Sequence, residues 1–250
     1  MSSLHDGRLV LRGQKKSSKH NFFLLTFELL LQSIFVSADC GNNRMLASGI
    51  SCSLIKDIVN SHNELRQSVA EGRVKNQPIA SNMREFYWDE ELAKGAQDWA
   101  NQCTFAHSED KDREVARFQV GQNLALTKSQ HEDTSAEKQF SRQITKWFSE
   151  HERFKFGPIL KMEDLETVGH YTQVVWANTY LVGCGYSRYK SPSNVFNSLY
   201  VCHYGPTGNE VTKKPYERGS QKCSENLIPS KKYPKLCSES FIRKFTFFLT

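Results

Sequence analysis

Seven cysteines are the most chemically informative residues of this 250-residue chain. No two of them form a Cys-x-x-Cys pair, the spacing typical of zinc ribbons and thioredoxin-like redox sites. So many cysteines are uncommon in reducing compartments, whereas disulfides form and persist outside the cytosol. The cysteine content therefore indicates a disulfide-bonded protein of an oxidising compartment.

Histidines and carboxylates are the other side chains that could do chemistry. A histidine and a carboxylate can serve as general base and orienting partner, and Ser108 beside His107 suggests a nucleophile. Adjacent side chains rarely face one another, however, and the chain has neither a Gly-x-Ser-x-Gly elbow nor a His-Glu-x-x-His zinc motif. Taken alone, Glu150 is predicted to lie on a charged helical surface, and His151 and His203 at the surface or in the core.

Composition and charge exclude several classes of protein. The chain is 38% hydrophobic and 24% charged, close to a globular average and unlike a disordered or fibrous polymer. Its formal net charge is +6, yet no five consecutive residues are basic, and the basic residues concentrate towards the two ends. Nucleic-acid binding needs a localised basic patch, so no nucleic-acid partner is expected.

The amino-terminal segment predicts export. Basic residues in 12–19 precede an apolar run over 22–36, which is shorter than the roughly 20 residues needed to span a bilayer. Glu28 within the run would cost roughly 2.5–3.5 kcal/mol at the bilayer centre, which disfavours a signal anchor. We expect residues 1–38 to be a signal peptide with an extended basic leader, cleaved before Asp39, although a gene-model extension would explain the leader equally well.

Three helices are predicted where apolar residues recur every three or four positions. The first runs from Leu54 to Val69. The second starts at Asp89, which can cap its first turn, and ends near Cys103. The third spans about residues 136–154.

Three strands are predicted where β-branched and aromatic residues cluster between turn-forming residues. They are residues 171–176, 182–189 and 198–204, and the last two form an antiparallel pair. Cys184 and Cys202 fall on these neighbouring strands, where a cross-strand disulfide is geometrically reasonable.

Helices first and strands last predict the α+β class, with helices covering a largely antiparallel sheet. Loops are predicted over residues 72–81 and 127–135, and loop or short helix over 108–117. In this arrangement His107 lies near the end of the second helix, and His170 opens the first strand.

Five segments carry longer sequence motifs. They are residues 62–67 (HNELRQ), 99–103 (WANQC), 120–125 (VGQNLA), 169–179 (GHYTQVVWANT) and 199–209 (LYVCHYGPTGN). Together they resemble the CAP superfamily of cysteine-rich secretory, antigen 5 and pathogenesis-related-1 proteins, also called the SCP domain. The resemblance covers about residues 40–237 and is strongest to the venom allergen 5 (antigen 5)-like proteins of arthropods.

The resemblance implies a three-layer α-β-α sandwich with a mainly antiparallel central sheet. The domain itself is expected over residues 54–209, after a lead at 39–53 and before a cysteine-containing extension at 210–250. That extension lacks the dense cysteine pattern of channel-regulating relatives. Its basic and apolar end, residues 241–250, could touch a membrane surface or could be a mispredicted last exon, and no stable membrane insertion is expected.

The resemblance also implies one cleft lined by two histidines and two acidic residues. The histidines fall on His107 and His170, and the acidic positions fall on Glu150 and Gln122. Imidazole nitrogen and carboxylate oxygen suit zinc in an open site, but the amide removes one negative charge. We expect no required cofactor, and a weakly bound divalent metal at the two histidines or an empty site.

The resemblance also implies three disulfides. The first of them is similar to a cysteine pair of the antigen 5 proteins. The expected pairs are Cys40–Cys103, Cys184–Cys202 and Cys223–Cys237. Cys52 is left over as a free thiol or an intermolecular bridge, and the pairing could shift to include it.

The function expected from the resemblance is that of a secreted, extracellular, monomeric protein of venom, saliva or haemolymph. Such a protein would act by binding a small lipid, a divalent metal or a host protein rather than by turnover. The alternatives are a metal-dependent extracellular hydrolase that uses the histidine and glutamate cleft, and a purely structural module. Aromatic residues could line an apolar groove but are more often core; they are Phe86, Tyr87, Trp88, Trp147 and Phe148.

Overall fold

The computed structural model describes residues 40–240, so the predicted signal peptide and the terminal residues 241–250 lie outside the described part. Its strands are β1 (Arg44–Ser48), β2 (Tyr87–Trp88), β3 (Gly121–Ser129), β4 (Leu181–Lys190), β5 (Phe196–Gly205), β6 (Leu227–Pro229) and β7 (Cys237–Glu239). Its α-helices are α2 (Cys52–Ala70), α3 (Glu90–Ala100), α4 (Asp110–Arg113), α5 (Phe140–Ser149) and α6 (Leu165–Val174). Short 3₁₀ turns are η1 (Ala136–Gln139), η2 (Glu150–Glu152) and η3 (Met162–Asp164).

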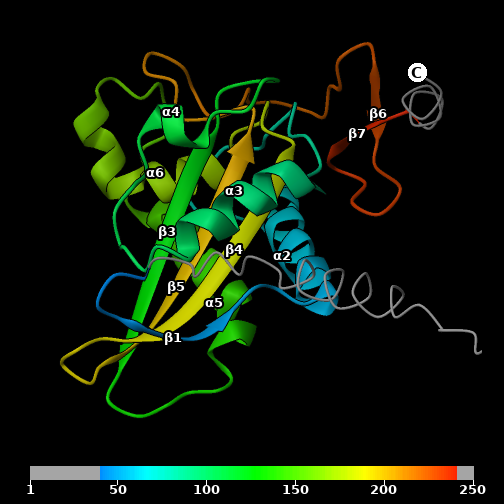
Figure 1. Cartoon of the computed structure of the whole chain (residues 1–250). Helices are drawn as coiled ribbons and strands as arrows, with labels where there is room; N and C mark the ends of the chain where they lie inside the picture. Colours follow the sequence, from blue (N-terminus) through cyan, green and yellow to red (C-terminus); the bar gives the residue numbers. More distant parts are fainter. Residues whose placement is uncertain (1–39, 241–250) are drawn as a thin grey trace, which may run out of the picture. The chain divides into compact units, whose positions relative to one another are not determined.

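One mixed sheet forms the middle layer, with strand order β1-β4-β5-β3 and β2 beside β4 (Figure 1). The β3–β5, β5–β4 and β4–β1 pairs are antiparallel, and only the two-residue β2 runs parallel to its neighbour. The ladder between β3 and β5 sets Gln122 opposite His203. The predicted α+β class and the three-layer α-β-α sandwich are confirmed.

Helix α3 covers one face of the sheet and begins where the sequence predicts, because the Asp89 side chain accepts a hydrogen bond from the Leu92 amide. Two glycines of β4 let it approach closely. A Cβ on Gly183 would lie 2.1 Å from the Ala93 nitrogen, and one on Gly185 would lie 2.4 Å from the Gln97 Cα. The helix backbone therefore rests directly on the strand.

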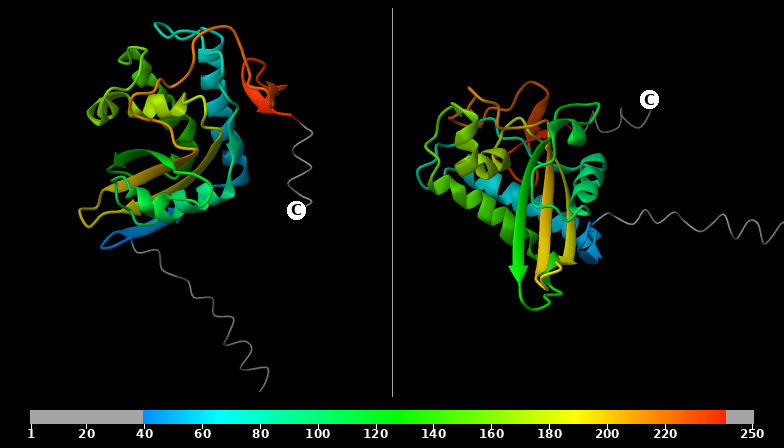
Figure 2. Two further views of the ribbon diagram at one scale, coloured as in Figure 1. Left: turned by 90° about the horizontal axis from the view of Figure 1, so that it is seen from above. Right: turned by 60° about the vertical axis from the view of Figure 1, so that its left-hand side comes forward.

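Helices α2, α5 and α6 form the opposite layer (Figure 2). Phe140 and Ile144 of α5 are fully buried, and the Phe140 ring packs edge-on against Tyr200 of β5. Fully buried Arg66 of α2 donates to the carbonyls of Val174 and Thr179 at 2.8 and 3.0 Å, which ties α2 to the end of α6 and the loop after it. The core lies between this layer and the sheet.

The predicted strand at residues 171–176 is wrong. Residues up to Val174 belong to helix α6, so His170 lies within a helix rather than at the start of a strand. Val168, Tyr171, Thr172 and Val174 are all buried. Residues 171–174 are all buried, so this stretch has no exposed face and is indistinguishable from a buried strand by its periodicity.

Two boundaries also differ from expectation. Helix α3 ends at Ala100, so His107 lies in the following loop and not at a helix end. Residues 127–129, predicted to be loop, complete β3 and pair with β5. Their side chains are polar because this end of the strand is only partly buried.

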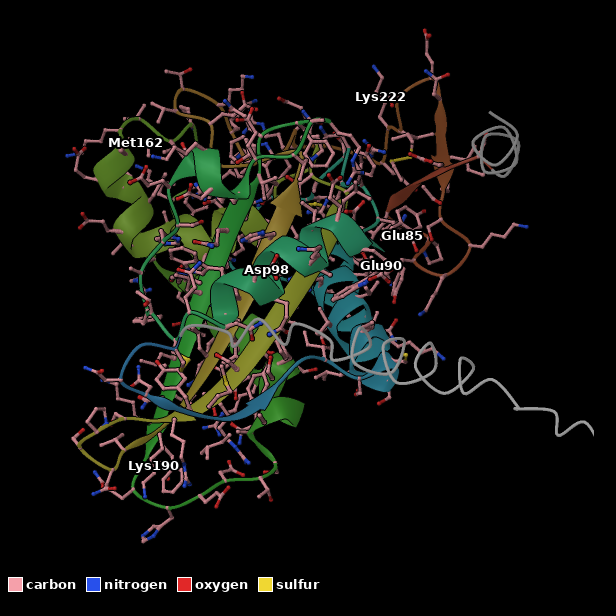
Figure 3. All side chains as sticks on the ribbon, in the orientation of Figure 1. Glu85, Glu90, Asp98, Met162, Lys190 and Lys222 are labelled. Carbon is pink, nitrogen blue, oxygen red and sulfur yellow. A yellow bond between two sulfur atoms is a disulfide. The ribbon has the colours of Figure 1, made fainter. Side chains whose placement is uncertain are left out.

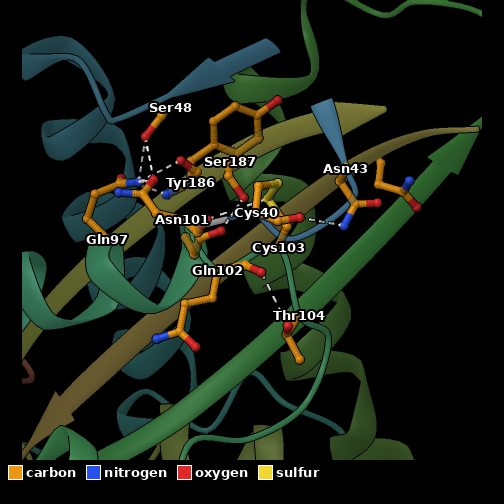
Figure 4. Close-up of a disulfide and its surroundings, with 12 residues drawn as sticks. Cys40, Asn43, Ser48, Gln97, Asn101, Gln102, Cys103, Thr104, Tyr186 and Ser187 are labelled. Atoms are coloured by element: carbon orange, nitrogen blue, oxygen red, sulfur yellow. Dashed lines mark hydrogen bonds between the residues drawn. A yellow bond between two sulfur atoms is a disulfide. The ribbon is translucent and has the colours of Figure 1, made fainter. Parts of the chain in front are cut away.

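All three expected disulfides are present, namely Cys40–Cys103, Cys184–Cys202 and Cys223–Cys237. Cys52 is a free, exposed thiol at the start of α2. Figure 4 shows the bridge from Cys40 to Cys103, which fastens the chain before β1 to the loop that leaves α3. Among residues 40–240, no helix combines the length and the apolar character that crossing a bilayer requires.

Candidate functional site

A cavity of about 780 Å³ opens beside the start of β3, between the loop that carries His107 and the helix that carries His170. Both histidines line it, and so does Gln122 of β3. Met162 of η3 is 64% exposed at its edge and projects outwards in Figure 3. The cleft expected from the sequence therefore exists, and its two histidines come from different elements.

Glu150 orients His170. It stands where α5 passes into η2, and its Oε1 accepts a hydrogen bond from His170 Nδ1 at 2.7 Å. Its Oε2 accepts from the Tyr171 backbone N–H at 3.1 Å. The Trp147 ring stacks on the His170 ring, with centroids 6.1 Å apart and planes at 13°. The His170 ring is thus fixed with Nδ1 as donor, and Nε2 is left for a ligand.

Gln122 orients His107 in the same way. Its Oε1 accepts from His107 Nδ1 at 2.8 Å and from the Ser108 backbone N–H at 3.2 Å. Its Nε2 donates to Ser108 Oγ at 3.2 Å and to His203 Nε2 at 3.1 Å. These four partners determine which end of the amide carries oxygen, so His107 also presents Nε2 to a ligand.

Burial keeps the rings around Gln122 neutral. Loss of solvent lowers the pKa of His107, the hydrogen bond to Gln122 partly opposes this, and the positive charge of Arg113 lowers the pKa further. Burial, aided by Arg113, also lowers the pKa of His203 to about 3. A neutral imidazole has a free lone pair, which is the form that binds metals.

Arg113 of α4 holds the His107 loop against β3. Its Nε donates to the Val120 carbonyl at 2.8 Å, and its Nη1 donates to the Ser108 carbonyl. Among the described residues that line the cleft, Arg113 is the one cation, and four are carboxylates: Asp110, Glu114, Glu166 and Glu210. Asp110 is paired with Arg113, and Glu210 with Lys213, so Glu114 and Glu166 supply the excess. The cleft therefore has an excess of negative charge, which favours cations.

Ser108 is not arranged as a nucleophile. Its side chain is buried, and its Oγ accepts from the Gln122 amide and from Arg113 Nη1 at 3.4 Å. Within residues 40–240 no histidine or carboxylate hydrogen-bonds to this hydroxyl. Both contacts come from donors, and neither can remove its proton.

The donor set has two nitrogen atoms. Both oxygens of Glu150 are used on His170 and Tyr171, and Gln122 is used on His107. No group of three or more histidine, cysteine or acidic side chains within the described range could hold a metal ion together. Zinc sites usually have three or four protein ligands, so these residues fit a weakly held ion that completes its coordination with water or a ligand.

Of the four residues that the sequence places in the cleft, His107, His170 and Gln122 line it. Glu150 is buried and contacts the cleft only through its hydrogen bond to His170. Sequence reasoning did not assign Arg113 to the site. It also left His203 at the surface or in the core; the ring is in the core and accepts a hydrogen bond from Gln122. The strand pairing would have given the signal, because β3 and β5 set Gln122 opposite His203.

His62 is connected to the site by a chain of hydrogen bonds through the core. This fully buried ring contacts the Tyr204 hydroxyl at 2.9 Å, and Asn123 donates to the same hydroxyl at 3.4 Å. Asn123 also donates to the His170 carbonyl at 3.2 Å. A polar chain therefore links α2 to the cleft through the core.

The chain matches known proteins over most of its length. The model of the cysteine-rich secretory protein (CAP) family matches residues 59–204. Venom allergen 5.01 of Dolichovespula maculata is 39% identical over 188 residues, which is 72% of this chain and 79% of the relative. Human cysteine-rich secretory protein 3 is 41% identical, over 68% of this chain and 64% of that protein.

Solved structures are also similar to this chain over most of its length. The crystal structure of NaASP2 with Zn²⁺ has a TM-score of 0.62 and 32% identity, over 76% of this chain and 97% of that one. The structure of BmVAL-1 has a TM-score of 0.65 and 26% identity, over 77% and 97%. With its motifs, its fold and its paired histidines, the chain belongs to the cysteine-rich secretory protein (CAP) family.

Proposed function

We propose that this is a secreted CAP protein that acts by binding, with a cleft that takes a divalent metal ion at His107 and His170 and a small ligand beside it. The observation that carries the proposal is the pair of imidazoles that line one cleft, each held by a hydrogen bond at Nδ1. Three disulfides and the venom allergen relatives support an extracellular location.

Three properties of the cleft support metal binding. Its lining carries more carboxylates than cations, the low pKa of His107 keeps that ring neutral, and the similar NaASP2 structure holds Zn²⁺. A bound ion would supply Lewis acidity and a fixed positive charge. The protein's part is to hold the two rings in one tautomer through Glu150 and Gln122.

The size of the cleft supports a further ligand. Its volume of about 780 Å³ lies within the range of about 300–1,000 Å³ typical of small-molecule sites. Binding is favoured over hydrolysis because the Ser108 hydroxyl accepts hydrogen bonds from Gln122 and Arg113 rather than facing a base.

Metal titration by calorimetry tests the proposal. Zn²⁺ should bind the wild-type protein, and His107→Ala and His170→Ala should each weaken binding at least tenfold, because each removes one of two nitrogen ligands. Glu150→Gln should weaken it by about 10-fold or more through the loss of orientation. His131→Ala is the matched control, because His131 is exposed and its ring makes no contact within the described residues.

Two results would contradict the proposal. Undiminished Zn²⁺ binding by a variant that lacks both His107 and His170 would place the metal elsewhere. Turnover of an ester or peptide substrate that disappears in His170→Ala and Glu150→Ala would establish the hydrolase instead. Native mass spectrometry before and after chelation would reveal a retained small ligand and its mass.

A further inference from the structure

A second hollow lies at the opposite end of the sheet from the cleft. It measures about 430 Å³ and is bounded by the ends of β3 and β4, the start of β5 and one side of α5. Figure 3 shows the two ends clearly, since Met162 marks the edge of the cleft and Lys190 ends β4 near the second hollow. The two hollows share no lining residue.

Among the side chains that the structure describes, four cations and one carboxylate line this second hollow, which we call the basic hollow. They are Lys128 of β3, Arg142 and Lys146 of α5, Arg188 of β4, and Asp133. Its charge is therefore opposite to that of the cleft. A site with this charge would select an anion.

The carboxylate of Asp133 interacts electrostatically with Arg188 but is hydrogen-bonded to neutral donors. Its Oδ1 accepts from the Ser135 backbone N–H at 2.8 Å and from the Ser135 hydroxyl at 2.6 Å, and its Oδ2 accepts from Gln139 at 3.0 Å. Arg188 instead donates to the Asp133 backbone carbonyl at 2.6 Å and pairs with Glu132 at 3.2 Å. One cation of the hollow is thus already paired.

The other three cations have no ion-pair partner in the described part of the chain. Lys128, Arg142 and Lys146 are exposed, and their side chains form neither a salt bridge nor a hydrogen bond there. Arg142 and Lys146 lie four residues apart, one turn of α5, and so project from the same helix face. Lys128 faces the hollow from the sheet. The three positive charges around this concave site repel each other. A multivalent anion bound between them would offset that repulsion.

The surroundings favour a soluble, ring-shaped anion over a membrane. Thr127, Ser129 and Ser198 add hydroxyl groups that can donate to oxyanions. Phe196 adds an aromatic wall, and Lys190 lies 5.0 Å from the centre of its ring. None of the large exposed apolar side chains of residues 40–240 lines the hollow, whereas binding in a membrane interface relies on such side chains.

We propose that the basic hollow binds a carbohydrate that carries several closely spaced sulfate or phosphate ester groups. Lys128, Arg142 and Lys146 bind the ester groups, and the hydroxyls and Phe196 contact the ring that carries them. The site is independent of the cleft, so it gives this protein a second ligand whose binding needs neither His107 nor His170.

Calorimetry on the secreted protein tests this proposal with three probes: a heparin octasaccharide, inositol hexakisphosphate, and vesicles containing phosphatidylinositol bisphosphate. The test variant is Lys128→Gln, Arg142→Gln, Lys146→Gln. Its matched control is Lys56→Gln, Lys75→Gln, Lys235→Gln, which removes the same charge from exposed lysines outside the hollow. Thermal melting should show that both triple variants remain folded, since all six side chains are exposed.

The test variant should bind the octasaccharide or the inositol phosphate at least about tenfold more weakly than wild type, if each ion pair contributes up to about 1 kcal/mol. The control should change affinity less than twofold. The tighter of the two soluble probes would identify the ester as sulfate or phosphate. Equal losses in both variants would mean a general effect of net charge and would overturn the proposal. Binding to vesicles alone would overturn it in favour of a membrane, and no binding to any probe would also refute it.

Discussion

Gln122 contacts two histidines, one through each end of its amide. Its oxygen accepts from His107 and its nitrogen donates to His203. A carboxylate has no N–H to donate, so opposite it His203 would have to carry its proton on Nε2. The sequence predicts only a lost charge at this position. The structure shows that the amide suits two neutral rings at once.

Two buried neutral histidines should make the protein less stable in acid. Burial lowers the pKa of His62 to about 4 and that of His203 to about 3, against an ordinary value of 6.5. Between pH 6.5 and 4 the unfolded chain therefore takes up protons that the folded chain does not. Their contribution to the free energy of unfolding is fully present above pH 6.5 and is lost as the pH falls towards 4 and 3. At pH 4.5 we expect a loss on the order of 2 kcal/mol for each histidine.

Urea unfolding at pH 7.0 and 4.5 measures this loss. His203→Gln keeps an acceptor for the Gln122 amide but cannot titrate, so it should lose less stability than wild type between the two pH values. His131→Gln removes an exposed ring and should behave as wild type. A His203→Gln variant as acid-sensitive as wild type would show that His203 does not carry the effect.

The residues of the site were predictable only in part. His107, His170, Glu150 and Gln122 follow from the family motifs, because nothing in their own spacing brings a loop, a helix and a strand to one place. His203 could not be placed without the pairing of β3 with β5. Its neighbour Gln122 lies on a strand whose outer end is polar and was predicted to be loop.

At the scale of elements, apolar periodicity predicted the helices that have one buried and one exposed face better than it predicted wholly buried segments. Helices α2, α3 and α5 each have one buried face and were found from their apolar spacing. The last turn of α6, residues 171–174, was predicted as strand, because all four of its side chains are buried. The error matters for the site, since a helix places His170 and Tyr171 so that both can bond to Glu150.

The contact of α3 with β4 gives a sharp prediction for one glycine. The Gln97 side chain bonds to both the N–H and the C=O of Tyr186, at 3.0 and 2.9 Å, so the helix is held at short range. Gly185→Ala would place a methyl group 2.4 Å from the Gln97 backbone. We expect a loss of about 1–3 kcal/mol in the free energy of unfolding, because backbone atoms cannot rotate away.

Gly157→Ala is the control for this contact. The nearest atom to its new Cβ is 3.9 Å away and its backbone is not strained, so stability should change by no more than about 0.5 kcal/mol. Urea denaturation of both variants measures the difference. If Gly185→Ala were as stable as Gly157→Ala, the helix would not rest on the strand as closely as described. The contact also bears on the cleft, because the indole of Trp99 in α3 donates to the Ala106 carbonyl at 2.9 Å, next to His107.

At the scale of the whole molecule, the two hollows lie in separate regions. The acidic cleft and the basic hollow occupy opposite ends of the sheet, and each combines side chains from helices with side chains from strands. The small hairpin of β6 and β7 is fastened by its own disulfide, Cys223–Cys237.

The disulfides should contribute unequally to stability. Cys40–Cys103 joins residues 63 apart, whereas Cys184–Cys202 and Cys223–Cys237 join residues 18 and 14 apart. A bridge that closes a longer loop removes more entropy from the unfolded chain, roughly 3 kcal/mol for 15 residues and more than 4 kcal/mol towards 100. Removing Cys40–Cys103 by paired alanine substitution should therefore lower the melting temperature most.

Thermal melting of the wild type with and without reductant, and of each paired variant, measures these contributions. Reductant should lower the melting temperature strongly, since each bridge typically contributes about 2–4 kcal/mol. Cys52→Ala should leave the melting temperature unchanged, because that thiol is exposed and unpaired in the described structure. A melting temperature indifferent to reductant would refute the disulfide framework. If the Cys40–Cys103 variant lost no more stability than the other two, loop length would not govern their contributions, and native packing around the bridges would have to account for them.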